Sequence, residues 1–199
     1  MKHHTLKVAV TGSIGSGKSA FCKILADKGY TVINADELSK KLLASNEKIK
    51  NKIKKVFGSE SYKNNEVNKK YIANKVFSSA ENVQKINSII HPAVISEIRK
   101  IFNELEGKEK IIFVEAALIY EADMENMFDN IVLVTADENI RKQRKISNGN
   151  ISAKEFEKRN SNQIQDIEKE KRADFVFENN SSLEDIKSKA GLLLTILTK

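Results

Sequence analysis

The stretch GSIGSGKS, from Gly12 to Ser19, sets glycines, a lysine and a serine at the spacing GxxxxGKS. Gly15 and Gly17 allow backbone angles that are closed to other residues, so successive N–H groups can point at phosphate oxygens. Lys18 offers a mobile cation to β and γ phosphates, and the Ser19 hydroxyl can coordinate Mg²⁺. An apolar segment before the loop and the amphipathic segment SAFCKILADKG after it complete the motif's context. The sequence thus predicts a nucleoside triphosphate site at Gly12, Ile14, Gly15, Ser16, Gly17, Lys18, Ser19 and Ala20.

Two carboxylates follow apolar runs and are candidates for chemistry beside this loop. Asp36 ends the run VINAD and Glu115 ends IIFVE. Ligands of open parallel sheets bind beyond the carboxyl ends of the strands, so both carboxylates can face the loop. In a functional interpretation, Asp36 orients an acceptor hydroxyl and takes its proton. In a structural one, Asn34 and Glu37 form a capping box at a helix start. The spacing alone permits both.

Five short runs dense in Val, Ile and Phe have the composition of strands buried on both faces. They are LKVAVTG from Leu6, TVINAD from Thr31, KIIFVEAAL from Lys110, NIVLVTA from Asn130 and ADFVFEN from Ala173. The sequence between them has helical periodicity. This alternation predicts right-handed crossovers and a three-layer α/β fold with a five-stranded parallel sheet.

The spacing of the runs is uneven, which predicts an insertion. About 70 residues separate the second run from the third, far more than one crossover needs. We expect a helix ending at Gly58, a second helix over NKKYIANKVFSS, and a long helix that Pro92 kinks or restarts. A further helical stretch runs from about Glu138 to Arg172, and a closing helix from Ser181 to Leu197.

Length and composition suit one globular domain. The chain has 199 residues, of which 40% are hydrophobic and 31% charged. No apolar run approaches the length of a membrane span, and the N-terminus leads directly into a strand, so we expect a cytoplasmic protein that does not bind membranes. The single Cys22 cannot form an internal disulfide and is expected to pack in the core. His3 and His4, on the terminus, are weak metal candidates and are set aside.

The net charge of +7 favours an anionic partner. In Lys-rich stretches such as KIKNKIKKVF, apolar residues recur at helical spacing, which favours a solvated helix face over a nucleic-acid patch. Trp is absent and aromatic residues are few, which argues against bases stacking on exposed rings. We therefore expect small-molecule partners and no nucleic acid.

The phosphate loop is shared by several classes of protein. GTPases of this class usually carry NKxD, and the segments NKIK, NKKY and NKVF all lack its Asp. Motors and helicases usually need a longer chain. A small-molecule kinase needs only the loop, an acceptor pocket, a carboxylate near the acceptor hydroxyl and a mobile cationic cover.

Together, five segments resemble bacterial dephospho-CoA kinases, in order and over nearly the whole chain. They are VTGSIGSGKSAF, GYTVINADELSKKLL, INSIIHPAV, IIFVEAALIYE and KRNSNQIQDIEKEKRADFVFENNSSLEDI. The resemblance implies Mg²⁺-dependent transfer of the ATP γ phosphate to the 3′-hydroxyl of dephospho-CoA, the last step of coenzyme A synthesis, by a chain that we expect to be monomeric. It implies a nucleotide-binding core at 1–36, 108–137 and 173–199, an acceptor-binding subdomain at 37–107 and a lid at 138–172.

The resemblance also implies roles for single residues. Lys18, Asp36 and Arg144 would be catalytic, with Asp36 as the general base and Arg144 in the lid. Ser19 would bind Mg²⁺. The acceptor site would comprise Asp36, His91, Leu118, Tyr120, Glu121, Arg159 and Gln163. Lys169 matches a further Lys of the family pattern.

Several of these residues keep a structural alternative. His91 could serve only to bond a neighbouring helix, Tyr120 to fill the core, and Arg159 and Lys169 to form ion pairs with Glu155 or Asp166. The remaining alternatives for the whole chain are a nucleoside or nucleotide monophosphate kinase and, from another class, a nucleotide-dependent regulator that binds nucleic acid.

The chain departs from the family pattern at four places. Asn34 replaces an Asp, Glu115 replaces the common Asp, and Ile119 and Tyr120 replace Leu and Phe. Asn148 stands where a second lid Arg is common, and Arg141, one turn before Arg144, is a candidate to supply the missing charge.

Overall fold

The computed structural model describes residues 4–147, 149 and 151–198. These residues form two compact units. The core unit comprises Met1–Asn34 and Leu105–Lys199, and the inserted unit comprises Ala35–Glu104. The inserted unit falls in the long interval between the second and third predicted strands.

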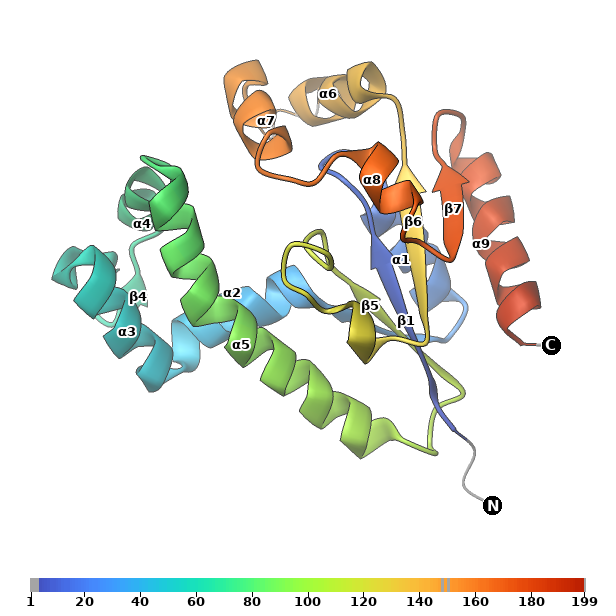
Figure 1. Ribbon diagram of the computed structural model, residues 1–199, viewed down its shortest axis with the longest axis horizontal. Helices are drawn as coiled ribbons and strands as arrows, with labels where there is room; N and C mark the ends of the chain where they lie inside the picture. Colours follow the sequence, from blue (N-terminus) through green and yellow to red (C-terminus); the bar gives the residue numbers. More distant parts are fainter. Residues whose placement is uncertain (1–3, 148, 150, 199) are drawn as a thin grey trace. The chain divides into compact units, whose positions relative to one another are not determined.

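The core unit is built on one parallel sheet of five strands, which confirms the predicted fold class (Figure 1). The strands are β1 (Leu6–Thr11), β2 (Thr31–Asn34), β5 (Ile111–Glu115), β6 (Asn130–Thr135) and β7 (Phe175–Glu178), in the order β2-β5-β1-β6-β7. All five correspond to predicted runs. Register aligns Asn34 with Glu115, and Glu115 with Val10, so the carboxyl ends of the three strands β2, β5 and β1 meet at one edge.

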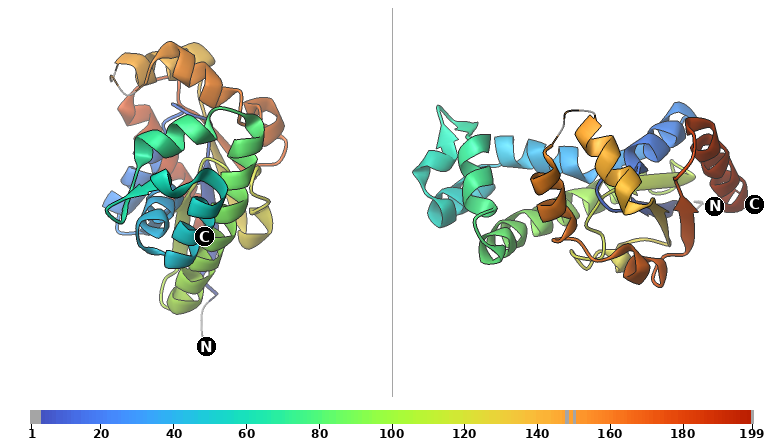
Figure 2. Two further views of the ribbon diagram at one scale, coloured as in Figure 1. Left: turned by 90° about the vertical axis from the view of Figure 1, so that its left-hand side faces the viewer. Right: turned by 90° about the horizontal axis from the view of Figure 1, so that it is seen from above.

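Helices cover both faces of this sheet. Figures 1 and 2 show α1 (Lys18–Asp27) and α9 (Leu183–Leu197) on one face and the short α8 (Asp166–Glu170) on the other. The 3-10 turn η2 (Glu125–Met127) precedes β6. Two further helices, α6 (Glu138–Ser147) and α7 (Ala153–Asn160), follow β6, so the predicted stretch from Glu138 to Arg172 is helical but divided.

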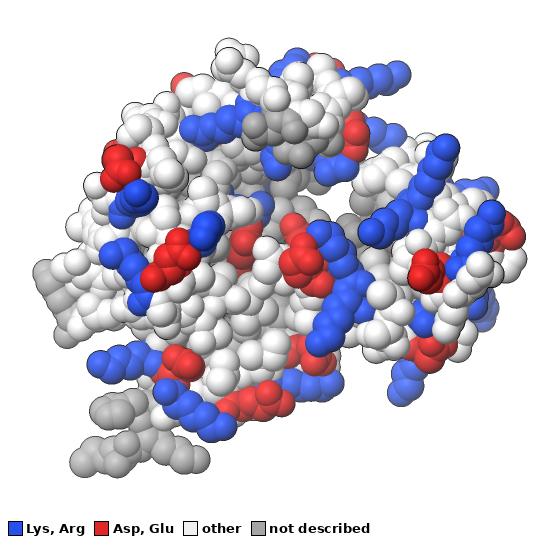
Figure 3. Space-filling model, turned by 180° about the vertical axis from the view of Figure 1, so that it is seen from behind, with Lys and Arg blue, Asp and Glu red and all other residues white. Residues whose placement is uncertain are grey.

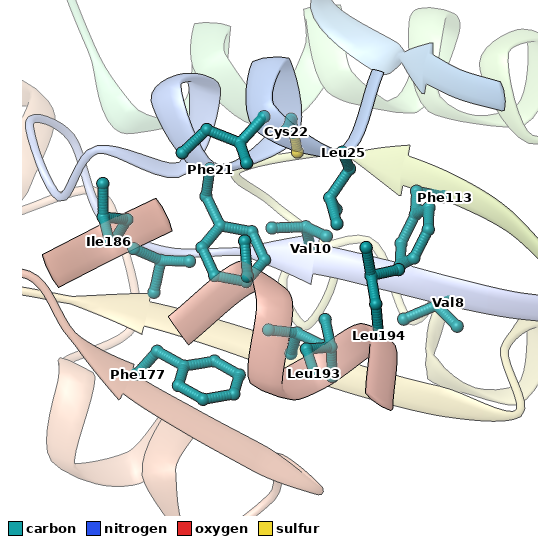
Figure 4. Packing of buried hydrophobic residues seen from close by; sticks show 14 of the residues in the cluster. Val8, Val10, Phe21, Cys22, Leu25, Phe113, Phe177, Ile186, Leu193 and Leu194 are labelled. Carbon is teal, nitrogen blue, oxygen red and sulfur yellow. The ribbon is translucent and has the colours of Figure 1, made fainter. Parts of the chain in front are cut away.

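The core lies between the sheet and the pair α1 and α9. Phe21 and Leu193 are fully buried there, and Phe21 stacks on Phe177 with ring centroids 5.6 Å apart (Figure 4). Each such side chain contributes about 1.5–3 kcal/mol by leaving water. Cys22 packs in the same cluster, as predicted, and its burial raises the pKa of the thiol.

The inserted unit is mostly helical. It contains α2 (Ala35–Ser45), α3 (Glu47–Phe57), η1 (Ser59–Ser61), α4 (Lys69–Val76) and most of α5 (Ala80–Leu105). Gly58 ends α3 as predicted, and its N–H donates to the carbonyl of Lys54 at 2.9 Å. The helix α5 runs unbroken through Pro92, so the prediction that a new helix starts there is wrong.

A small hairpin in the inserted unit was not predicted. It pairs β3 (Tyr62–Lys63) with β4 (Glu66–Val67) through Asn64 and Asn65, whose φ angles are 48° and 67°. Two successive residues with positive φ make the tight turn that matches the twist of a hairpin, and Asn tolerates this conformation.

The surface carries many charges of both signs. On the face drawn in Figure 3, Asp and Glu side chains are interspersed among the Lys and Arg side chains. Several lysines pair with an acid one helical turn away, as Lys23 does with Asp27 and Lys100 with Glu97. Among the described residues, no helix combines the length and apolar character needed to cross a membrane.

Candidate functional site

The phosphate loop connects β1 to α1, and its glycines are required by the backbone. Gly17 has φ 98° and stands at the N-terminus of α1, which has no side-chain cap. A Cβ on Gly17 would lie 2.0 Å from Nδ2 of Asn179, and a Cβ on Gly15 2.6 Å from the carbonyl oxygen of Arg141. Larger residues would therefore displace the loop, whose uncapped N–H groups remain available to an anion.

Three side chains from distant parts of the core unit hold this loop. Nδ2 of Asn179 donates to the carbonyl of Ser16 at 2.8 Å. The backbone N–H of Ile14 donates to Oε1 of Gln163 at 2.9 Å, and Nη1 of Arg141 donates to the carbonyl of Ile14 at 3.3 Å. The loop is thus fixed by β7's end and by the helical segment that follows β6.

A cavity of about 210 Å³ opens between the loop and α6. It is lined by Gly15, Gly17, Lys18, Ser19, Arg144 and Lys145. Among the described residues, no acidic side chain forms an ion pair with Lys18, Arg144 or Lys145, and Nη1 of Arg144 is buried without a hydrogen-bond partner. Buried donors normally have a hydrogen-bond partner, and cations without an acidic partner can bind phosphate oxygens. The cavity therefore has the character of a phosphate site.

Ser19 and Glu115 form an oxygen-rich corner of the same site. The Ser19 hydroxyl donates to Oε1 of Glu115 at 2.5 Å, and Nδ2 of Asn34 donates to Oε2 at 2.8 Å. Among the described residues, no group of three or more His, Cys, Asp or Glu could hold a metal by itself. Mg²⁺ needs only one or two such ligands when phosphates and waters complete its shell, so this corner fits it.

A buried polar network lies beneath the loop. Lys169 is fully buried, and its Nζ donates to Oγ of Ser13 at 3.1 Å. The Ser13 hydroxyl in turn donates to Oδ1 of Asp166, and the Thr135 hydroxyl donates to Oδ2 at 3.2 Å. Burial lowers the pKa of Lys169, although Glu121 and Asp166 oppose this shift. The network ties α8 to the start of the phosphate loop.

Arg141 joins this network and does not face the cavity. Its side chain is 7% exposed, and its Nη2 lies 3.6 Å from Oδ2 of Asp166. Its Nε donates to the carbonyl of Ala136 at 2.9 Å, and its Nη1 donates to Oδ1 of Asn160 at 2.8 Å. The suggestion that Arg141 replaces a missing lid charge is therefore wrong. Asn148, the position of that missing charge, lies outside the described residues.

Two residues predicted to bind the acceptor make contacts inside the core unit. Tyr120 is 3% exposed, its ring lies 4.4 Å from the guanidinium carbon of Arg172, and burial raises its pKa to about 12. Oε1 of Glu121 accepts the N–H of Ile164 at 2.9 Å and lies 3.8 Å from Nζ of Lys169. Oε2 of Glu121 is buried without a hydrogen-bond partner in the described part of the chain. The acceptor roles of both residues stay predictions.

The remaining predicted residues are spread more widely. Gln163 bonds the phosphate loop, which is a donor-side contact, and Arg159 pairs with Glu155 at 2.5 Å on α7, the structural alternative noted for it. Leu118 is half-buried after β5. Asp36, exposed in the first turn of α2, and His91, half-buried on α5, belong to the inserted unit, and their roles stay predictions.

Sequence reasoning missed Lys145, Asp166 and Asn179 as members of the site. The sequence carried a signal for Asn179, because it is the last residue of the fifth predicted run and directly follows β7, at the edge where ligands bind. Lys145 is adjacent to Arg144 on the predicted lid helix. Asp166 carries no local signal, since its partner Ser13 is 153 positions away in sequence.

Comparison with known proteins identifies relatives of this chain in sequence and in structure. A family model described as dephospho-CoA kinase matches residues 6–185. A dephospho-CoA kinase of Protochlamydia amoebophila is 34% identical over 183 residues, which cover 90% of each chain. A crystal structure from Thermus thermophilus has a TM-score of 0.83 at 30% identity and covers 98% of this chain and 100% of its own. The dephospho-CoA kinase from Campylobacter jejuni has a TM-score of 0.66 at 25% identity, with 97% of each chain covered. The chain therefore belongs to the dephospho-CoA kinase family.

Proposed function

We propose that the protein transfers the γ phosphate of ATP to the 3′-hydroxyl of dephospho-CoA, which gives coenzyme A and ADP. The observation that carries this proposal is the cationic cavity between the phosphate loop and α6, in a chain of the dephospho-CoA kinase family. The substrates are then ATP and dephospho-CoA. The enzyme is a cytoplasmic monomer.

On the donor side, Lys18 and the N–H groups of the loop hold the β and γ phosphates. Arg144 lines the cavity, has one buried guanidinium nitrogen without a hydrogen-bond partner among the described residues, and neutralises charge on the transferring group. The transition state of phosphoryl transfer is loose, so positioning and charge neutralisation contribute most of the rate enhancement. Asn179, which lies outside the lid segment, holds the loop that carries these amides, and Gln163 and Arg141 of the lid segment add further contacts to it.

Ser19 and Glu115 are the residues that would hold Mg²⁺. Mg²⁺ held there with ATP would supply charge neutralisation and help to orient the γ phosphate. Glu115 is 7% exposed and already oriented by Ser19 and Asn34, so little side-chain freedom remains to be lost.

On the acceptor side, Asp36 orients the ribose hydroxyl and accepts its proton. The bond from the acceptor oxygen to the γ phosphorus forms while the bond to the β–γ bridging oxygen breaks, and ADP leaves. In a loose transition state the proton moves late, so Asp36 acts mainly by placing the hydroxyl for in-line attack. The inserted unit binds dephospho-CoA, and the segment 138–172 closes over the donor and excludes water.

A substrate panel tests this proposal. ADP release from ATP and Mg²⁺ is measured with dephospho-CoA, with nucleosides and with nucleoside monophosphates. We expect dephospho-CoA to be preferred by kcat/KM on the order of 100-fold or more, because its recognition uses the whole inserted unit. A nucleoside or nucleotide as the preferred acceptor would replace the proposal. Steeply salt-dependent binding to RNA or DNA without any transfer would support the regulator instead.

A further inference from the structure

Helix α6 carries four cations within five positions, and their surroundings divide them into two pairs. Arg141 is fixed beneath the loop by Ala136 and Asn160, and Nζ of Lys142 pairs with Oε1 of Glu157 at 2.7 Å. Arg144 and Lys145 instead line the cavity. Arg141 and Lys142 are thus held by contacts within the protein, whereas Arg144 and Lys145 line the cavity beside the phosphate loop.

Lys145 is held in this cavity without an anionic partner. Its side chain is half-buried, and among the described residues no carboxylate forms an ion pair with it. Burial lowers its pKa most, and the charges of Lys18 and Arg159 lower it further. Each of these influences disfavours the charged form of the Lys145 ammonium, whereas an anion bound beside it would favour that form.

The residues that line the cavity indicate which anion Lys145 would bind. Its other walls are the glycines of the loop together with Lys18 and Ser19, so a phosphate that reaches Lys145 also reaches the loop. The diphosphate of the acceptor is a second source of the same chemistry. The loop residues in the lining favour the donor nucleotide, because Lys18 serves the β and γ phosphates.

We propose that Lys145 is a second cation of the lid helix, beside Arg144, and that it binds the terminal phosphate of the donor nucleoside triphosphate. This inference rests on the proposed function in taking ATP as the donor, and it adds a substrate-binding residue to that site. An ammonium that meets phosphate oxygens in a half-buried cavity forms charge-assisted hydrogen bonds, which are stronger than neutral ones.

The test compares K145Q with K142Q, which removes the same charge from the same helix but from an ion pair facing Glu157. Affinities for ATP and ADP, each with Mg²⁺ and without dephospho-CoA, are measured by titration calorimetry. In K145Q we expect ATP affinity to fall about tenfold and ADP affinity to fall much less. K142Q should stay within about twofold of the starting protein for both nucleotides. K145R, which keeps the charge, should recover most of the ATP affinity.

Three results would overturn the inference: equal losses in K145Q and K142Q, equal losses for ATP and ADP, or a loss of dephospho-CoA affinity with ATP affinity unchanged. Circular dichroism establishes that each variant is folded, and K145M, for which the expectation is the same, replaces K145Q if that variant unfolds. Turnover of the unsubstituted protein on dephospho-CoA is measured separately. Its absence would remove the proposed acceptor, whereas discrimination between ATP and ADP reports on Lys145 alone.

Discussion

The Ser19 hydroxyl donates to Oε1 of Glu115 at 2.5 Å and so joins the first turn of α1 to the end of β5. The amide of Asn34, which register places opposite Glu115 on β2, donates to the second carboxylate oxygen at 2.8 Å. A single buried carboxylate is thereby oriented from two sides, next to the loop that would hold the nucleotide phosphates.

Glu115→Gln tests whether this carboxylate holds Mg²⁺. The substitution keeps the side-chain size but removes the charge, so the Mg²⁺ concentration that gives half-maximal activity should rise about tenfold or more. It is measured by titrating Mg²⁺ at saturating ATP. Glu178→Gln, an exposed carboxylate at the end of β7, should leave this concentration unchanged. An unchanged Mg²⁺ requirement in Glu115→Gln would show that Glu115 does not hold Mg²⁺ and serves only to orient Ser19 and Asn34.

Arg144→Ala tests charge neutralisation by the lid helix. Arg144 lines the cavity without an acidic partner in the part of the chain that the structure describes, so its removal should lower kcat about 100-fold with a smaller effect on the KM for ATP. Steady-state kinetics over a range of ATP concentrations gives kcat and the KM for ATP separately. Arg172→Ala removes an arginine that instead pairs with Glu125 and covers Tyr120, and its kcat should fall less than about threefold. Equal losses of kcat in both variants would contradict a specific role for Arg144.

Asp36→Asn separates the two interpretations of the VINADEL segment. If Asp36 places the acceptor hydroxyl, kcat should fall on the order of 100-fold while ATP affinity, measured by calorimetry, stays within about twofold. If the acids at positions 36 and 37 only favour the start of α2, Asp36→Asn and Glu37→Gln should each have near-normal turnover and a small loss of stability. Near-normal turnover in Asp36→Asn would therefore show that Asp36 is not the general base.

Glu106 is predicted to make the stability of the core unit depend on pH. Its hydrogen bonds from Lys7 and from the N–H of Thr5 lower its pKa from 4.5 to about 2. A carboxylate with a lowered folded-state pKa stabilises fully above pH 4.5 and loses this contribution as the pH falls toward 2. Glu106→Gln should thus be less stable in urea at pH 7, and its difference from the starting protein should shrink at pH 3. Glu109→Gln is the control, and a difference that does not vary with pH would refute the assignment.

Much of the fold could be predicted from local sequence. Buried parallel strands are dense in apolar residues, so all five strands of the sheet were evident, as was the helix end at Gly58. The hairpin at Asn64 and Asn65 escaped prediction because its strands are two residues long and bury little. Pro92 was expected to start a new helix or to kink the existing one. The helix α5 continues through it without a new start, since one missing backbone donor can be tolerated within a long packed helix.

The site was predictable only where its chemistry is local. The phosphate loop is contiguous and was found whole. Arg141 was suggested as a lid charge because nothing in sequence distinguishes a cavity-facing side chain from one turned into the core. Conversely, the contact of Asp166 with Ser13 spans 153 positions, and the division of the α6 cations depends on which face of the helix meets the loop.

The most direct measurement is the mass of the reaction product. The protein is incubated with ATP, Mg²⁺ and dephospho-CoA, and the acceptor is analysed by mass spectrometry before and after the reaction. The proposed function predicts a time-dependent gain of one phosphate, located on the ribose 3′-hydroxyl by fragmentation, with one ADP formed per phosphate transferred and no gain in a Lys18→Met variant. ATP hydrolysis without any change in the mass of dephospho-CoA, or transfer to a different hydroxyl, would contradict it.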